Sequence, residues 1–149
     1  MIEDFLFNWI KKQKYGITVY PADLFELRIQ EEMIRTDEAH GFFVYIEVNF
    51  VKVRGTLKDE NAEYDFWKAF LKSLATKNRG SDSYGLLQGN SGIGLLLLDS
   101  EMQGWYRLKG RIQEFCRLTI GDVSETLNQG IKAFVYPACL ARPEKSPTP

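Results

Sequence analysis

Few side chains in this sequence have the type and spacing that catalysis requires. His40 is the only histidine, which excludes mechanisms that need two histidines from one chain, and its place beside Gly41 suits a cation at a helix C-terminus. Cys116 and Cys139 have neither a nearby histidine nor CxxC spacing, so we interpret them as structural thiols. Five glycines bracket the predicted hairpin and superficially resemble a phosphate-binding loop: Gly80, Gly85, Gly89, Gly92 and Gly94. No Gly-Lys-Ser/Thr motif and no helix start directly follows them, which argues against such a loop.

The composition fits a single globular domain. The chain has 149 residues, of which 44% are hydrophobic and 26% charged, and its net charge is -1. This balance argues against a general electrostatic grip on nucleic acid or on an anionic membrane. The longest aliphatic run is the leucine stretch at 95–98, far shorter than the ~20 apolar residues of a membrane span. Acids near the N-terminus and the scarcity of cysteines favour a cytoplasmic protein.

Three segments are predicted along the chain. Residues 1–16 place apolar residues at helical spacing and end in lysines, which predicts an amphipathic N-terminal helix. This helix either packs on its own domain or forms a surface for a partner chain. Residues 17–138 form the main domain, and the Pro-rich residues 139–149 are predicted to be disordered.

The main domain begins with a helix and a strand. A helix is predicted over residues 23–39, with Asp23 as its N-cap. Residues 42–53 are dense in β-branched and aromatic side chains, which predicts a central strand. On this helix the apolar residues are expected to face inward: Leu24, Phe25, Leu27 and Ile34. The charged residues are expected to face outward: Glu31, Glu32 and Arg35.

The remaining elements complete a βαββαβ pattern. Asp59 is expected to cap a helix over 60–78, and a hairpin follows over 83–98 with its turn at 90–92. A helix over about 101–116, a short helix near 122–128 and a last strand over 131–136 come next. The predicted fold class is α+β, a ferredoxin-like or nucleotidyl-cyclase-like antiparallel sheet with helices on one face, preceded by the N-terminal helix.

Several short motifs in this order resemble the GGDEF domain family, the diguanylate cyclases that make the bacterial second messenger cyclic di-GMP. Residues 23–35 resemble the family's opening helix, and residues 45–52 resemble its first strand with the pattern Asp-x-Asp-x-Phe-Lys. Residues 79–82 (Arg-Gly-Ser-Asp) resemble the segment before its signature hairpin. Residues 93–100, 108–112 and 130–135 resemble the strand, helix and last strand that follow. The resemblance covers about residues 17–136.

The catalytic acids of the family are largely missing from the matching positions. A cyclase of this kind holds Mg²⁺ against the triphosphate with carboxylates on two adjacent strands. Here the first-strand pair is Glu47 and Asn49, and residues 89–93 (Gly-Asn-Ser-Gly-Ile) replace the signature, which puts Ser91 and Gly92 at its acid positions. The resemblance therefore implies no catalytic residues, no cofactor and loss of cyclase activity. Glu47 is the one candidate metal ligand, and we interpret it instead as an ordinary strand-end or paired acid.

A second site implied by the resemblance keeps its polar residues. Many GGDEF enzymes carry an inhibitory product site, Arg-x-x-Asp before the signature, joined by arginines of the next helix. Arg79 and Asp82 match this pattern, and Arg107 and Arg111 lie one turn apart on that helix. Arginine offers a planar fork to phosphate or to a guanine edge, and aspartate accepts from guanine N–H groups. The alternative is a helix-end ion pair beside solvated arginines.

The sequence thus predicts a catalytically inactive GGDEF-like signalling module that acts by binding, with cyclic di-GMP as the candidate ligand. Two alternatives stay open. A divergent nucleotidyl cyclase would use Mg²⁺, Glu47 and a substitute acid such as Asp99. A purely structural domain would bind a protein partner or a second copy through the N-terminal helix.

Overall fold

The computed structural model describes residues 19–76, 83–98 and 102–137. The predicted N-terminal helix over residues 1–16 and the predicted disordered tail over residues 139–149 lie outside these ranges, as do Arg79, Asp82 and Asp99. Among the helices of the described ranges, none is long and apolar enough to cross a membrane.

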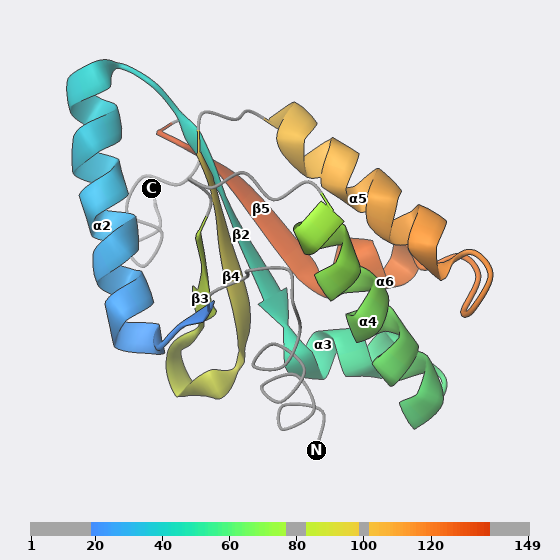
Figure 1. Cartoon of the computed structure of the whole chain (residues 1–149). Helices are drawn as coiled ribbons and strands as arrows, with labels where there is room; N and C mark the ends of the chain where they lie inside the picture. The colour runs from blue at the N-terminus through green and yellow to red at the C-terminus, as the bar shows by residue number, and fades with distance from the viewer. Residues whose placement is uncertain (1–18, 77–82, 99–101, 138–149) are drawn as a thin grey trace.

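A five-stranded sheet forms the centre of the domain, in the order β1-β3-β4-β2-β5 (Figure 1). The strands are β1 (Val19–Tyr20), β2 (Phe43–Asn49), β3 (Ser83–Leu86), β4 (Gly92–Leu98) and β5 (Ile131–Tyr136). Every neighbouring pair is antiparallel except β1 and β3, which are parallel. β4 is buried along its whole length, as its run of apolar residues predicts for a central strand.

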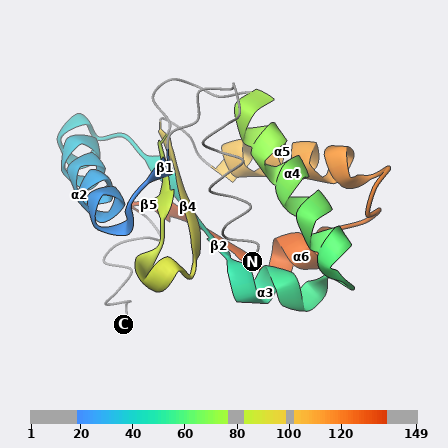
Figure 2. The ribbon, with the colours of Figure 1, turned by 60° about the horizontal axis from the view of Figure 1, so that its bottom comes forward.

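Helices cover both faces of this sheet (Figures 1 and 2). α4 (Glu60–Thr76) and α5 (Met102–Cys116) lie side by side on one face, where they cross over from β2 to β3 and from β4 to β5. This confirms the predicted βαββαβ pattern. α2 (Ala22–Ala39) covers the opposite face, so the expectation of helices on one face holds only for the two crossovers. The short helices α3 (Phe50–Thr56) and α6 (Ser124–Gln129) pack together.

The face under α4 and α5 holds the larger hydrophobic core. Asp59 caps α4 as predicted, because its carboxylate accepts the backbone N–H of Ala62 at 2.8 Å. Both helices bury the following apolar residues against the sheet: Trp67, Phe70, Leu71 and Leu74 of α4, and Trp105, Leu108 and Ile112 of α5.

The inward face of α2 differs from the prediction. Three residues expected to face inward are more than half exposed: Leu24 (51%), Leu27 (56%) and Ile34 (61%). Phe25, which is buried, lies over Gly85 of β3 and Gly94 of β4, where any added Cβ would collide with its ring. Two paired glycines leave a shallow notch in the sheet, and an aromatic ring fills it better than a leucine stripe would.

A buried polar cluster takes the place of the expected apolar contacts on α2. Glu31 and Arg35 are exposed as predicted, but Glu32 is buried. Its carboxylate accepts hydrogen bonds from Arg28 and Arg35 at 3.1 Å and from the hydroxyl of Thr36 at 3.2 Å. A buried charge is tolerated only when it is paired and hydrogen-bonded, and this cluster meets that condition within one helix.

Two helices begin where the sequence did not predict a start. α2 begins at Ala22 with Pro21 in the cap position, so Asp23 lies in the first turn and is not the N-cap. The strand expected to continue to Val53 ends at Asn49, whose side-chain oxygen accepts the backbone N–H of Lys52 at 2.9 Å and caps α3. An N-cap stabilises a helix at this point more than β-branched composition stabilises a longer strand.

The hairpin formed by β3 and β4 is confirmed, with a turn slightly earlier than predicted. A single 3-10 turn, η1 (Gln88–Asn90), joins the strands. Gly89 and Asn90 adopt φ values of 69° and 53°, a left-handed conformation that glycine and asparagine accept more readily than other residues. The short helix near 122–128 and the last strand over 131–136 are confirmed as α6 and β5.

Candidate functional site

A groove of about 700 Å³ lies between α2, the tip of the β3–β4 hairpin and the neighbouring parts of β2 and β5. One wall is apolar and comes from α2 and β5, with Ile29, Met33 and Phe134. The end near the hairpin tip is polar and includes Glu47 and Lys132. This polar end is where the two sets of residues matched to the family's catalytic acids come together.

Glu47 lies on β2 at the polar end of the groove. Its carboxylate accepts the hydroxyl of Tyr45 at 2.8 Å, and in the sheet register it lies directly across from Lys132 of β5. Burial raises the pKa of Tyr45, and the negative charge and hydrogen bond of Glu47 raise it further, so the phenol remains a proton donor to this carboxylate. Glu47 is therefore hydrogen-bonded within its own strand.

Asn49 lies opposite Gly92 in the register of β2 and β4. The structure thus brings together the first-strand position and the signature position that the sequence matched to the family's acids. The side-chain oxygen of Asn49 is used to cap α3. This residue has a structural role that its match to a metal ligand did not indicate.

The hairpin tip passes very close to the end of β2. A Cβ atom on Gly92 would collide with the carbonyl oxygen of Val48, and the backbone carbonyl of Ser91 accepts the N–H of Phe50 at 2.9 Å. The hydroxyl of Ser91 donates to the carbonyl of Gln88 at 3.0 Å. One of the two positions that the sequence matches to the signature acids therefore has no room for a side chain.

Among the residues that the structure describes, the carboxylates that a Mg²⁺–triphosphate complex requires are not gathered at this tip. Within residues 19–76, 83–98 and 102–137, no group of three or more His, Cys, Asp or Glu side chains is placed to hold a metal ion. Glu47 is the one matched position that keeps a carboxylate. The donor set of the described tip does not fit Mg²⁺, which prefers several oxygen ligands in a near-octahedral arrangement.

Two lysines line the groove and were missed by sequence reasoning. Lys52 extends from α3 and Lys132 from β5, and neither has an ion-pair partner among the residues that the structure describes. The pairing of β2 with β5 was the signal that could have found Lys132, because it places this residue across from Glu47. An anionic group at this end of the groove would meet two ammonium groups.

Of the four residues matched to the family's inhibitory site, the structure places two. Arg107 is exposed on α5, and Arg111, one turn later, is partly buried and directs its Nε toward the carbonyl of Ser73 on α4 at 3.4 Å. Burial lowers the pKa of Arg111, and the positive charge of Arg107 lowers it further. Arg79 and Asp82 lie outside the described residues, in the segment that follows α4.

The other candidates have structural roles. His40 is the C-cap residue of α2, with a left-handed φ of 56°, and its side chain is exposed. Cys116 is buried at the end of α5, and burial raises the pKa of its thiol to about 11. A thiol that stays protonated at neutral pH is a poor nucleophile, as the interpretation of a structural thiol predicts.

The fold is that of GGDEF domains. No protein-family model and no curated protein matches the chain. The DGC protein from Thermotoga maritima has a TM-score of 0.59 and 17% identity, over 89% of this chain and 92% of that one. The GGDEF domain of PA1120 (TpbB or YfiN) from Pseudomonas aeruginosa matches in two structures. One has a TM-score of 0.54 and 17% identity over 80% of this chain and 72% of that one, and the other 0.53 and 16% over 83% and 79%.

Proposed function

We propose that this GGDEF-like domain is a signalling module that acts by binding and does not catalyse nucleotide cyclisation. The observation that supports this most directly is the tip of the β3–β4 hairpin. There Gly92 occupies a signature acid position and contacts the backbone of Val48 so closely that no side chain fits.

The proposed lack of cyclase activity follows from the shortage of carboxylates at the hairpin tip. A triphosphate requires a metal ion to neutralise it and to lower the pKa of the attacking hydroxyl, and the metal requires carboxylates. Among the described residues of the tip, Glu47 supplies one carboxylate, which already accepts the Tyr45 hydroxyl and lies across from Lys132. One engaged carboxylate is too little to hold Mg²⁺ in the geometry that phosphoryl chemistry requires.

The candidate ligand is cyclic di-GMP, recognised by Arg107 and Arg111 of α5 together with Arg79 and Asp82. The spacing of these two arginines, one helical turn apart on α5, supports this choice, because paired guanidinium groups suit a phosphate or a guanine edge. Ser73, which Arg111 contacts, lies in the last part of α4, shortly before the segment that contains Arg79.

A turnover assay tests the absence of catalysis. The full chain incubated with GTP and Mg²⁺ or Mn²⁺ should form no cyclic di-GMP and release no pyrophosphate above a protein-free blank. The same assay with ATP covers other nucleotidyl cyclases. Turnover that Glu47→Ala abolishes would reject the proposal and favour a divergent cyclase.

Calorimetry tests the ligand. We expect cyclic di-GMP to bind the full chain, and Arg107→Ala or Arg111→Ala to weaken binding by about tenfold or more, as loss of a charged hydrogen-bonding partner predicts. Arg117→Ala is the matched control, because Arg117 is an exposed arginine near the same helix that pairs with Glu114. The absence of heat with cyclic di-GMP would reject this ligand and favour a domain that binds proteins alone.

A further inference from the structure

The outer face of α2 is unusual for an exposed helix. Three of the seven large apolar side chains that are exposed in the described residues lie on it: Leu24, Leu27 and Ile34. Leu27 and Ile34 are two turns apart on the same side, and Leu24 is one turn before Leu27. Single exposed leucines are ordinary, but an apolar row along one helix marks a contact surface.

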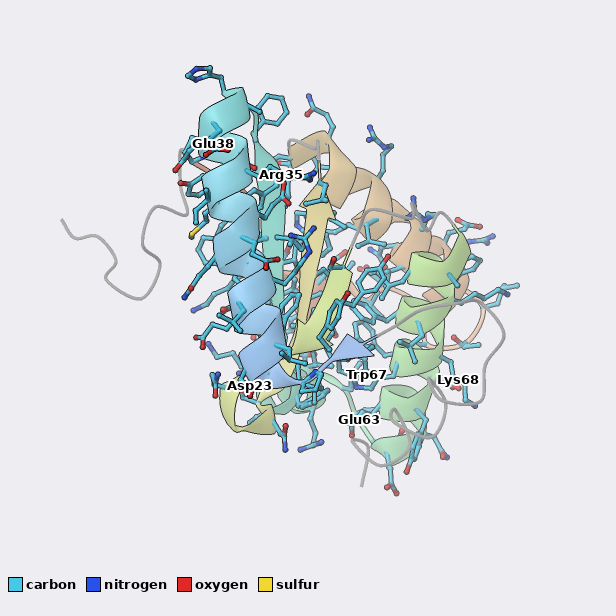
Figure 3. The ribbon with its side chains drawn as sticks, turned by 60° about the vertical axis from the view of Figure 1, so that its left-hand side comes forward. Asp23, Arg35, Glu38, Glu63, Trp67 and Lys68 are labelled. Carbon is cyan, nitrogen blue, oxygen red and sulfur yellow. The ribbon has the colours of Figure 1, made fainter. Side chains whose placement is uncertain are left out.

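Acidic side chains lie within and beside this apolar row. α2 carries six acidic and two basic residues, a net charge of -4 in a chain whose total is -1. Glu31 and Glu38 are exposed and have no ion-pair or hydrogen-bond partner among the residues described. Figure 3 shows Asp23 at the first turn and Glu38 near the last turn, so acids stand at both ends of the row.

The two cations of α2 do not neutralise these acids. Arg28 and Arg35 both bind the buried carboxylate of Glu32 at 3.1 Å. Their charges are therefore already paired with a carboxylate of their own helix, although the Arg35 side chain remains 65% exposed. The exposed acids on the outer face remain free to attract a cation from another molecule.

The negative charge of this face indicates which kind of partner can bind to it. An anionic membrane would be repelled, and two copies meeting through the same face would bring acid against acid. The spacing of the apolar residues, at three and seven positions, is the spacing that a second amphipathic helix packs against. The partner that fits both features has leucine-like residues on one side and lysines or arginines beside them.

We propose that the outer face of α2, consisting of Leu24, Leu27 and Ile34 with the acids around them, is a docking surface for a basic amphipathic helix of a partner protein. The apolar side chains supply the buried contact, and Glu31 and Glu38, which lie on the same side of the helix four positions after Leu27 and Ile34, select positive charge. This inference does not depend on nucleotide binding, because neither α5 nor the groove contributes to the surface.

A synthetic peptide of leucine and lysine, roughly 14 residues or four helical turns long and patterned as an amphipathic helix, is the probe. Fluorescence anisotropy of the labelled peptide with the full chain should show saturable binding that weakens as salt rises. The double variant Leu27→Ser and Ile34→Ser should weaken binding by about tenfold or more. Leu118→Ser is the matched control, because Leu118 is 85% exposed after α5, far from α2 in sequence. It should bind like the unchanged chain.

Further variants separate the two parts of the surface. Glu31→Gln with Glu38→Gln should weaken binding several-fold and reduce its salt dependence, and a peptide with glutamate in place of lysine should not bind. Binding that the serine variants leave unchanged would overturn the proposal, since charge alone would then explain it. Sedimentation velocity in which the chain self-associates, and the serine variants do not, would also overturn it, since the occupant would be a second copy. Circular dichroism checks that the variants are folded.

Discussion

The two faces of the sheet differ in how they are covered. On one face, α4 and α5 bury a continuous cluster in which Trp67 meets the rings of Phe50, Phe66 and Phe70 at centroid distances of 5.2 to 5.4 Å. On the other face, α2 contributes a smaller aromatic cluster around Phe25. Figure 3 shows α2 and α4 on opposite sides of the strands, with Trp67 turned toward the sheet.

The two faces of the sheet therefore have different roles, since the α4 and α5 side determines stability and the α2 side is available for recognition. The α4 and α5 side is mostly apolar, as a core that determines stability should be. The α2 side holds the groove, the hydrogen-bonded Glu47, two lysines without ion-pair partners in the described residues, and an exposed apolar row. Residues that remain accessible on a folded domain are the ones available to a ligand or partner.

The largest expected effect is on the α4 side. Trp67→Ala should lower the free energy of unfolding by about 3–5 kcal/mol, because it removes a fully buried ring from a close-packed cluster. Met33→Ala, on the half-buried wall of the groove, should cost only about 1 kcal/mol. Urea unfolding followed by circular dichroism measures both. Equal losses would contradict the division of roles between the faces.

Trp67→Phe sharpens this comparison. The indole N–H of Trp67 is buried and, among the described residues, is the one buried side-chain polar atom without a hydrogen-bond partner. The phenylalanine variant keeps most of the ring contacts and removes that polar group, so it should lose clearly less stability than the alanine variant.

The next effect is at the hairpin tip. Gly92→Glu, which places an acid at the position of the signature, should destabilise the domain by about 1–3 kcal/mol because its Cβ collides with the Val48 carbonyl. Ser91→Asp, at the neighbouring exposed position, should change stability by no more than about 0.5 kcal/mol. Thermal unfolding of the two variants compares them. A stable Gly92→Glu variant that forms cyclic di-GMP would contradict both the packing argument and the proposed loss of catalysis.

The elements on the α4 side could be predicted from the sequence, whereas the packing of α2 could not. An apolar stripe such as Trp67, Phe70 and Leu74 has one face that can be buried, so its direction follows from periodicity. On α2, the sequence pattern alone does not decide which leucines and glutamates face the sheet. The outcome depends on a glycine notch in two other strands and on a carboxylate paired within its own helix, and both are tertiary features that hydropathy does not encode.

The candidate site shows the same limit. The sequence matched Asn49 and residues 89–93 to the family's acid positions, and the strand register then pairs Asn49 with Gly92. The exclusion of a side chain at Gly92 and the place of Lys132 across from Glu47 depend on register and close approach. A single sequence contains no local signal for either.

A smaller effect is expected at the start of α3, where the groove meets the sheet. Asn49→Ala should cost about 1 kcal/mol, because the N–H of Lys52 loses the side-chain oxygen that caps the helix. Asn49→Asp keeps an acceptor at this position and should retain the stability of the unchanged chain. Equal destabilisation by both variants in urea unfolding would show that the cap contributes little.

The smallest expected effect concerns acid stability at the edge of the α5 side. Asp122 accepts hydrogen bonds from the backbone and hydroxyl of Ser124 and from Gln113, and these bonds lower the pKa of its carboxyl from 3.8 to about 2. A carboxyl with a lowered pKa in the folded state stabilises the domain above its unfolded pKa, and this contribution is lost as pH falls through about 2. The stability gap between the unchanged chain and Asp122→Ala should therefore close between about pH 4 and pH 2. Ser124→Ala should raise the pKa of Asp122 toward its ordinary value, which a carboxyl-carbon NMR titration measures directly. A pKa that does not move in this variant would mean that the loop between α5 and α6 is not held by these bonds.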